Sequence, residues 1–118
     1  QQAGKIKHIG LSEVDVELIE QAQDYFEAVS VQNRYNFGQQ KWNDVLKYCE
    51  AQNIAFIPWY PLSAGNLEAE QAIHRVAERH QATEYQVALA WLLAASPVML
   101  PIATIKLTEE DFQDMPLP

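Results

Sequence analysis

The chain has 118 residues, of which 48% are hydrophobic and 20% are charged, a composition typical of one folded domain and not of a disordered segment. Its 16 acidic residues against 8 basic ones give a formal net charge of -8, so we expect no nucleic-acid partner. The single cysteine, Cys49, excludes an internal disulfide, the longest apolar run is too short for a membrane span and the first residues carry no secretory signal, so we expect a cytoplasmic protein.

The first apolar run, residues 5–11, predicts a strand. Helical periodicity follows from Val16 and ends near Ala28, with Ser12 and Asp15 as candidate N-caps. The spacing predicts one buried stripe on this helix, formed by Val16, Leu18, Ile19, Ala22 and Phe26.

Two further strands are expected in the middle of the chain, at residues 29–32 and 54–57. The polar residues 33–38 read as a loop after the first of them. Apolar spacing over residues 42–52 predicts the intervening helix, and Asn53 is a candidate C-terminal cap. The run 54–57 is apolar at every position, as expected for a parallel strand covered on both faces.

Residues 58–65 read as the exit loop of that strand, and residues 68–80 as an amphipathic helix. Thr83 and Gln86 have the spacing of a capping box, which predicts the start of another helix. This helix is apolar on nearly every side, so we expect it to be deeply packed. Residues 98–102 predict a fourth strand, and a helical turn capped by Thr108 is expected in the tail.

Four strands separated by helices imply an α/β fold with a parallel sheet coated by helices. A small doubly wound sheet and part of a barrel both satisfy this pattern. A complete (β/α)8 barrel takes about 250 residues, so this chain can supply only about half of one.

Ligands of such folds gather where the strands end, and three side chains there suit a flat heterocycle that carries an amide. Ser12 offers a hydroxyl, Gln32 an amide and Trp59 an aromatic face. From residue type alone, structural roles are favoured over ligand binding for each of them: a helix cap, a loop amide and a packed aromatic ring.

Four segments carry a resemblance to a known family: GKIKHIGLS at residues 4–12, VQNRYN at 31–36, IPWYPL at 57–62 and QVALAWLL at 86–93. Their order and spacing resemble those of the aldo-keto reductase family. The resemblance implies one partial domain, residues 1–118, that forms the C-terminal half, strands five to eight, of an NADP(H)-dependent (β/α)8 barrel (TIM barrel) that reduces aldehydes and ketones.

The same resemblance implies roles for individual residues. Ser12 and Gln32 would hydrogen-bond the nicotinamide carboxamide, and Trp59 would stack on the nicotinamide ring. The backbone amides expected to face the pyrophosphate are those of Tyr60, Leu62, Ser63 and Gly65. Glu13 stands where many relatives carry an Asn that also holds the carboxamide; a carboxylate cannot donate that hydrogen bond unless it is protonated.

Two departures from the family pattern bear on activity. The Asp, Tyr, Lys and His of the catalytic tetrad belong to the first four strands, which no part of this chain matches, so we assign no catalytic residue and expect the chain to be inactive alone. Ile102 also runs almost directly into Ala103, where relatives carry a loop and helix that grip the 2′-phosphate. If the chain lacks this loop and helix, NADP(H) affinity is weakened or lost. The alternative is that the given sequence omits this internal stretch, in which case we expect only that the phosphate loop is mobile.

His74 and His80 lie six residues apart, on different faces of one helix, so we expect no metal site. Half a barrel leaves unpaired strand edges and an uncovered concave face. We therefore expect either a complementary half-barrel or a second copy of the chain, in a homodimer, as the partner. The alternative is a non-catalytic half-barrel fragment that serves as an assembly or interaction module.

Overall fold

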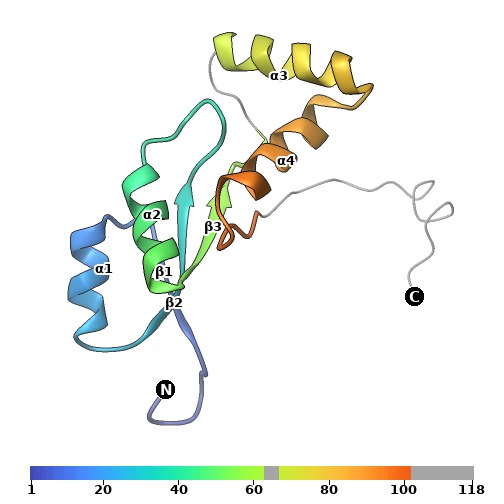
Figure 1. The fold of residues 1–118 in the computed structure, drawn as a ribbon. Coiled ribbons are helices and arrows are strands. Elements are labelled where there is room, and N and C mark those ends of the chain that lie inside the picture. The colour runs from blue at the N-terminus through green and yellow to red at the C-terminus, as the bar shows by residue number, and fades with distance from the viewer. Residues whose placement is uncertain (63–66, 102–118) are drawn as a thin grey trace, which may run out of the picture.

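The computed structural model describes residues 1–62 and 67–101. Strands and helices alternate along this part of the chain (Figure 1). They are β1 (Ile9–Ser12), α1 (Val16–Gln23), β2 (Ala28–Arg34), α2 (Asn43–Gln52), β3 (Ala55–Trp59), α3 (Leu67–His80) and α4 (Glu84–Ala95). The strands form one parallel sheet in the order β1-β2-β3, so the expected α/β fold with parallel strands and helices is confirmed.

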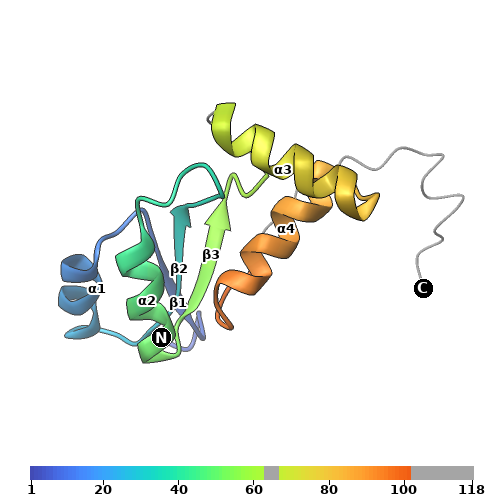
Figure 2. The same ribbon diagram turned by 45° about the horizontal axis from the view of Figure 1, so that its top comes forward.

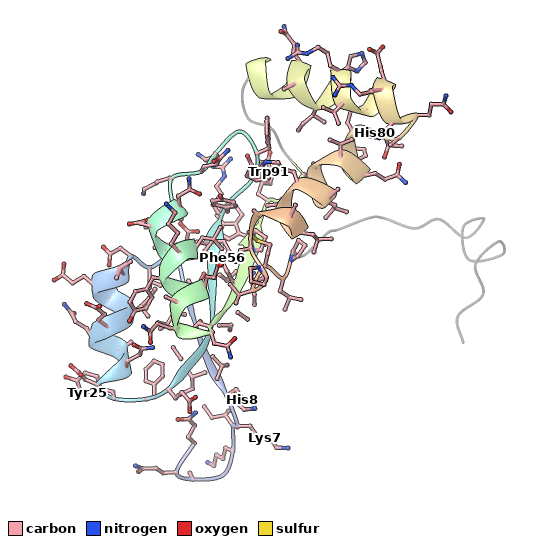
Figure 3. The ribbon with its side chains drawn as sticks, viewed as in Figure 1. Lys7, His8, Tyr25, Phe56, His80 and Trp91 are labelled. Carbon is pink, nitrogen blue, oxygen red and sulfur yellow. The ribbon has the colours of Figure 1, made fainter. Side chains whose placement is uncertain are left out.

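The strand boundaries differ from those expected from the sequence. β1 begins only at Ile9, and residues 5–8 are exposed; Figure 3 shows Lys7 and His8 in an N-terminal segment away from the core. β2 extends to Arg34 through residues predicted to be a loop, because Asn33 is fully buried and its side chain bonds the backbone of Val14. β3 likewise includes residues assigned from the sequence to its exit loop, up to its last residue, Trp59.

The fourth strand expected at residues 98–102 is reduced, among the described residues, to a single parallel bridge between Met99 and Phe56 of β3. The Phe56 amide donates to the Val98 carbonyl at 2.9 Å, and the Leu100 amide donates to the Phe56 carbonyl at 2.8 Å. Ile102 and the helical turn expected at Thr108 lie outside the described residues.

The helices that contact the sheet lie on one side of it. In Figures 1 and 2, α1 and α2 lie side by side on that face, and α4 flanks β3. The main core fills the space between sheet and helices, with Phe56 at its centre (Figure 3). Its fully buried side chains include Ile19, Val31, Val45, Cys49, Phe56 and Leu92.

The helix ends follow the sequence in most respects. The Asp15 side chain accepts from the Leu18 amide at 2.9 Å, and Asn53 ends α2 in the left-handed conformation, at φ 56°. The predicted capping box of Thr83 and Gln86 is present in both directions. These three end signals are confirmed.

Two predictions about helix burial are wrong. α1 ends at Gln23, and of its expected stripe Leu18 is 48% exposed. α4 is not deeply packed within the described chain: Ala88 and Leu92 are buried, but Leu93 is 59% exposed. Only α3 and the edge of the main core contact α4 among the described elements, and two surfaces cannot cover a helix that is apolar all round.

A smaller cluster of Ile73 and Ala88 joins α3 to α4, with Leu62 packed against it. No helix in residues 1–62 and 67–101 is both long and apolar enough to cross a membrane.

Candidate functional site

One face of the sheet is free of described helices. Side chains alternate between the two faces of a strand, and Val31 and Phe56 point toward the helices. Their neighbours therefore point to the opposite side, which we call the helix-free face. It carries Gly10 and Ser12 of β1, Ser30, Gln32 and Arg34 of β2, and Ala55, Ile57 and Trp59 of β3.

The strand register gathers three of the predicted site residues on this face. Ser12 pairs with Gln32 across β1 and β2, and Gln32 pairs with Ile57 of β3. Trp59 lies two residues beyond Ile57, so its ring is on the same face, one strand over and one pleat further along. Neither the Ser12 hydroxyl nor the Gln32 amide hydrogen-bonds another described residue, which leaves both groups available to a ligand.

Glu13 ties the ends of the three strands together. Its backbone has φ 53°, in the left-handed region, and its amide donates to the Gln32 carbonyl at 3.0 Å. Its carboxylate Oε1 accepts from the backbone amide of Arg34 and from the indole Nε1 of Trp59, both at 2.6 Å. The position singled out as a carboxamide contact in relatives therefore binds the aromatic ring in this chain.

Arg34 lies next to the Glu13 carboxylate and the Trp59 ring. Its guanidinium carbon is 5.5 Å from the ring centre of Trp59 and 4.8 Å from that of Tyr60, distances at which a cation is attracted to an aromatic face. Its Nε atom is buried and has no hydrogen-bond acceptor among the described residues.

The predicted pyrophosphate segment is only partly described. Tyr60 has φ 59°, and its carbonyl accepts from the Asn36 side chain at 3.1 Å. The Leu62 side chain packs into the small α3–α4 cluster. Ser63 and Gly65 lie outside the described residues.

The buried titratable groups lie on the other side of the sheet. Burial raises the pKa of Tyr35, whose hydroxyl donates to Asn43 Oδ1 at 2.5 Å, and burial raises the pKa of Cys49 to about 11. Both side chains belong to the helix-covered core, so neither offers a proton to the helix-free face. Within the part of the chain that the structure describes, no three His, Cys, Asp or Glu side chains are grouped so that they could hold a metal ion.

The sequence identified Ser12, Gln32 and Trp59 as candidates but gave Arg34 no role. Strand alternation could have identified Arg34, because a residue two places after Gln32 lies on the same face if the strand continues. The polarity of residues 33–38 predicted a loop instead, so the strand was expected to end before Arg34. The link between Glu13 and Trp59 has no local signal, because it joins residues 46 apart in the chain.

Comparisons with known proteins identify relatives over nearly the whole chain. Residues 1–110 match the family model described as "Aldo/keto reductase family". An uncharacterised oxidoreductase of Schizosaccharomyces pombe is 50% identical over 100 residues, and pyridoxine 4-dehydrogenase of Escherichia coli is 38% identical over 100 residues. These matches cover 84% and 85% of this chain but only 33% and 35% of the relatives, so the chain spans about a third of their length.

Two further matches show the similarity of the fold and a difference in length within the matched region. The crystal structure of a thermostable aldo-keto reductase in complex with the inhibitor epalrestat superposes with a TM-score of 0.74 at 29% identity, covering 95% of this chain and 48% of that one. An NADP(+) aldo-keto reductase of S. pombe is 29% identical over 149 aligned residues, covering 94% of this chain and 44% of its own. Because 149 exceeds the 118 residues of this chain, that relative carries residues within the matched region that this chain lacks.

Proposed function

The chain belongs to the aldo/keto reductase family, and on that premise we propose that it forms the nicotinamide-binding side of a reductase barrel, as a single partial domain that corresponds to strands five to eight. Members of this family generally use NADP(H) as the hydride carrier. The observation that carries the proposal is the placement of Ser12, Gln32 and Trp59 on the helix-free face, at the carboxyl ends of three parallel strands. Ligands of barrels bind at that end.

Each of these residues has a defined task in the proposal. The Ser12 hydroxyl and the Gln32 amide are adjacent across β1 and β2, close enough to bind the two ends of one carboxamide. Trp59, held by Glu13, supplies a flat face for the nicotinamide ring. The bound cofactor supplies the hydride; these side chains orient the ring that carries it.

We expect the proposed site to hold the phosphates of the cofactor less firmly than its nicotinamide. Backbone amides of Tyr60, Leu62, Ser63 and Gly65 would face the pyrophosphate, and no basic loop between Ile102 and Ala103 is available to hold the 2′-phosphate. The additional residues in the matched region of a relative are consistent with a segment missing from this chain. We therefore propose an NADP(H) site with reduced affinity.

The proposal assigns no proton donor to this chain. Carbonyl reduction needs an acid that protonates the new alkoxide, and the family places that acid in the half of the barrel that this chain does not match. Tyr35 and Cys49 face the helices, away from the proposed nicotinamide site. We therefore propose that the chain binds cofactor and does not turn over by itself. The partner that completes the site would be a complementary half-barrel or a second copy.

A titration with NADPH tests the proposal. Binding is followed by the fluorescence of NADPH itself, in the parent chain and in Q32A, with Q71A on the exposed side of α3 as the matched control. Loss of the Gln32 amide is expected to weaken binding about tenfold, the effect of about 1.4 kcal/mol, and Q71A is expected to match the parent.

Two outcomes would contradict the proposal. The first is no NADPH response up to millimolar concentration, which would instead support the assembly-module reading. The second is equal affinity in Q32A and the parent chain, which would place the cofactor elsewhere.

A further inference from the structure

Arg34 is the one cation among the residues that define the helix-free face, and contacts with neighbouring residues hold it in position. It follows Gln32 by two residues on the central strand, so its side chain leaves the same face one pleat nearer the strand end. The rings of Trp59 and Tyr60 both lie within 5.5 Å of its guanidinium carbon. Glu13 fixes the backbone amide of Arg34 and the indole of Trp59 with the same carboxylate oxygen.

The Nε–H group of this guanidinium is nevertheless without an acceptor in the described part of the chain. Its Nε is buried, and no described residue accepts a hydrogen bond from it. The carboxylate Oε1 of the adjacent Glu13 accepts instead from the Arg34 backbone amide and from the Trp59 indole. A buried donor on a cation is costly to leave unpaired, and cation–π contacts satisfy the charge but not the N–H groups. An anionic acceptor that reaches the Nε–H group would remove this cost.

We propose that Arg34 is an anion-binding group of the site, which takes the carboxylate or phosphate oxygens of a ligand held on the helix-free face. The planar fork of a guanidinium matches either group with two parallel hydrogen bonds. This inference rests on the proposed function and deepens it, because it assigns an anionic group to the molecule that lies beside the nicotinamide.

The geometry limits where that anionic group sits. Successive same-face residues of a strand are about 7 Å apart, so an anion on Arg34 lies about that distance beyond a carboxamide bound by Gln32, on the side of Tyr60. Two sources reach this point: a phosphate of the cofactor, through the ribose, or the carboxylate of an acidic carbonyl substrate.

The experiment observes the side chain directly. The chain contains three arginines, Arg34, Arg75 and Arg79, so a ¹⁵N-labelled sample gives three Nε–H signals in an NMR spectrum, and the R34Q variant identifies the first. Inorganic pyrophosphate and succinate are titrated separately into the parent chain. A saturable shift of the Arg34 signal is expected with at least one of them, whereas the exposed Arg75 and Arg79 signals are expected to stay in place.

Pyrophosphate and succinate, together with two reduced nicotinamide compounds that differ by one phosphate, distinguish the two sources of the anionic group. A shift with pyrophosphate, together with weaker binding of reduced nicotinamide mononucleotide but not of reduced nicotinamide riboside in R34Q, identifies a cofactor phosphate. A shift with succinate alone identifies a carboxylate ligand.

Variants test the geometry of the contact. R34Q is expected to weaken binding of the responding probe about tenfold or more, and R34K, which keeps the charge but not the fork, is expected to recover only part of it. R79Q removes the same charge from α3 and is expected to bind like the parent. Thermal unfolding curves confirm that each variant is folded.

The inference is overturned if neither probe shifts the Arg34 signal, or if R79Q weakens binding as much as R34Q. Its failure is distinct from failure of the proposed function. If NADPH binds but no probe shifts the Arg34 signal, the nicotinamide site is supported and the anion site is contradicted. If pyrophosphate shifts the Arg34 signal but NADPH does not bind, the anion site is supported and the nicotinamide site is contradicted.

Discussion

Glu13 adopts a left-handed backbone conformation, at φ 53°, that costs a non-glycine residue about 1–2 kcal/mol. Its hydrogen bonds offset this cost: its amide donates to Gln32, and its carboxylate accepts from the Arg34 amide and the Trp59 indole. The residue thereby sets the orientation of the ring that we propose to face the nicotinamide. We expect its effect on a ligand to be indirect, through Trp59, and a double-mutant comparison can distinguish this from a direct contact.

Removing the Glu13 carboxylate is expected to weaken NADPH binding about fivefold, because Trp59 loses its hydrogen-bond acceptor. E13Q keeps an acceptor oxygen in place and is expected to bind much like the parent. In a W59F background, where no indole N–H exists, E13A is expected to have little further effect. NADPH fluorescence titrations of the four variants measure this coupling; equal losses from E13A in both backgrounds would show that Glu13 does not act through Trp59.

The Cys49 thiol is expected to resist modification in the folded chain. It is fully buried, and burial raises its pKa to about 11, so thiolate, the reactive form, is about a hundredfold scarcer at neutral pH than for an ordinary cysteine. Because it is the single cysteine, a disulfide reagent reports it without ambiguity. Labelling at the same rate in native buffer and in denaturant would contradict the structure of the core.

At the scale of elements, the pairing of β1 with β2 depends on a close approach at Gly10. A Cβ atom placed there would lie 2.4 Å from the Ser30 hydroxyl oxygen, and the register shifts between Ile9 and Gly10. The two strands thus come together where one residue has no side chain and its neighbour on β2 has a small one.

The variant G10A is expected to lower the free energy of unfolding by about 1 kcal/mol, because the Ser30 side chain must move. In an S30A background the same change is expected to be neutral or slightly stabilising, since alanine also reduces the entropy of the unfolded chain. Urea unfolding of the double-mutant cycle measures the difference. Additive effects of the two substitutions would show that the residues do not meet.

Between α3 and α4, His74 is expected to titrate above its ordinary pKa of 6.5. The Glu84 carboxylate, 2.8 Å from Nδ1, raises the pKa first by its hydrogen bond, and the charge of Glu78 raises it further. A raised pKa means that the stabilising contribution is fully present below the pKa of the unfolded chain and is lost as pH rises through the folded value.

An NMR titration of His74 checks this expectation. E84Q is expected to lower the pKa of His74 toward 6.5, whereas E27Q, which removes an exposed acid between α1 and β2, is the charge-matched control. A pKa of His74 that does not respond to E84Q would show that the contact between the two helices is absent in solution.

The sequence predicted the helix ends better than the strand ends, and the reason is physical. Caps are local: Asp15, Asn53 and the Thr83 box satisfy backbone groups within a few residues, so their signals lie in the adjacent sequence. The ends of β1 and β2 depend on partners far along the chain, such as the contact of Asn33 with Val14. The local polarity of residues 33–38 was therefore a misleading guide.

The candidate site shows the same division. Residue type alone selected Ser12, Gln32 and Trp59, because a hydroxyl, an amide and a large ring stand at strand ends. Arg34 became a candidate only when strand register placed it beside Trp59, and Glu13 acquired its role from a contact 46 residues away. Family resemblance adds roles to matching positions but does not predict contacts between residues that differ from the family.

At the scale of the whole molecule, the sheet is open within the described residues. β1 has one strand partner, and β3 has, besides β2, only the bridge at Met99. On the helix-free face, Trp59 is 38% exposed, although its ring is a large hydrophobic group. A surface of this kind is more stable when another sheet covers it.

We therefore expect the purified chain to self-associate at micromolar concentration. Sedimentation velocity is expected to show a species heavier than the 13.4 kDa monomer, and association is expected to weaken in an I57E variant, which places a charge on the helix-free face. Y25E, which places the same charge at a side chain that is 87% exposed between α1 and β2, is the control. A well-folded monomer at these concentrations would contradict a half-barrel that needs a partner.

The central claim is that the helix-free face is the surface that holds a nicotinamide. An NMR titration with NADPH, observed at the Trp59 indole N–H and the Gln32 side-chain amide, tests it most directly. The account predicts that both signals shift with one common dissociation constant, while the indole signals of Trp42 and Trp91, which pack against the helix-covered core, stay in place. Binding of NADPH that leaves the Trp59 and Gln32 signals unmoved would contradict it.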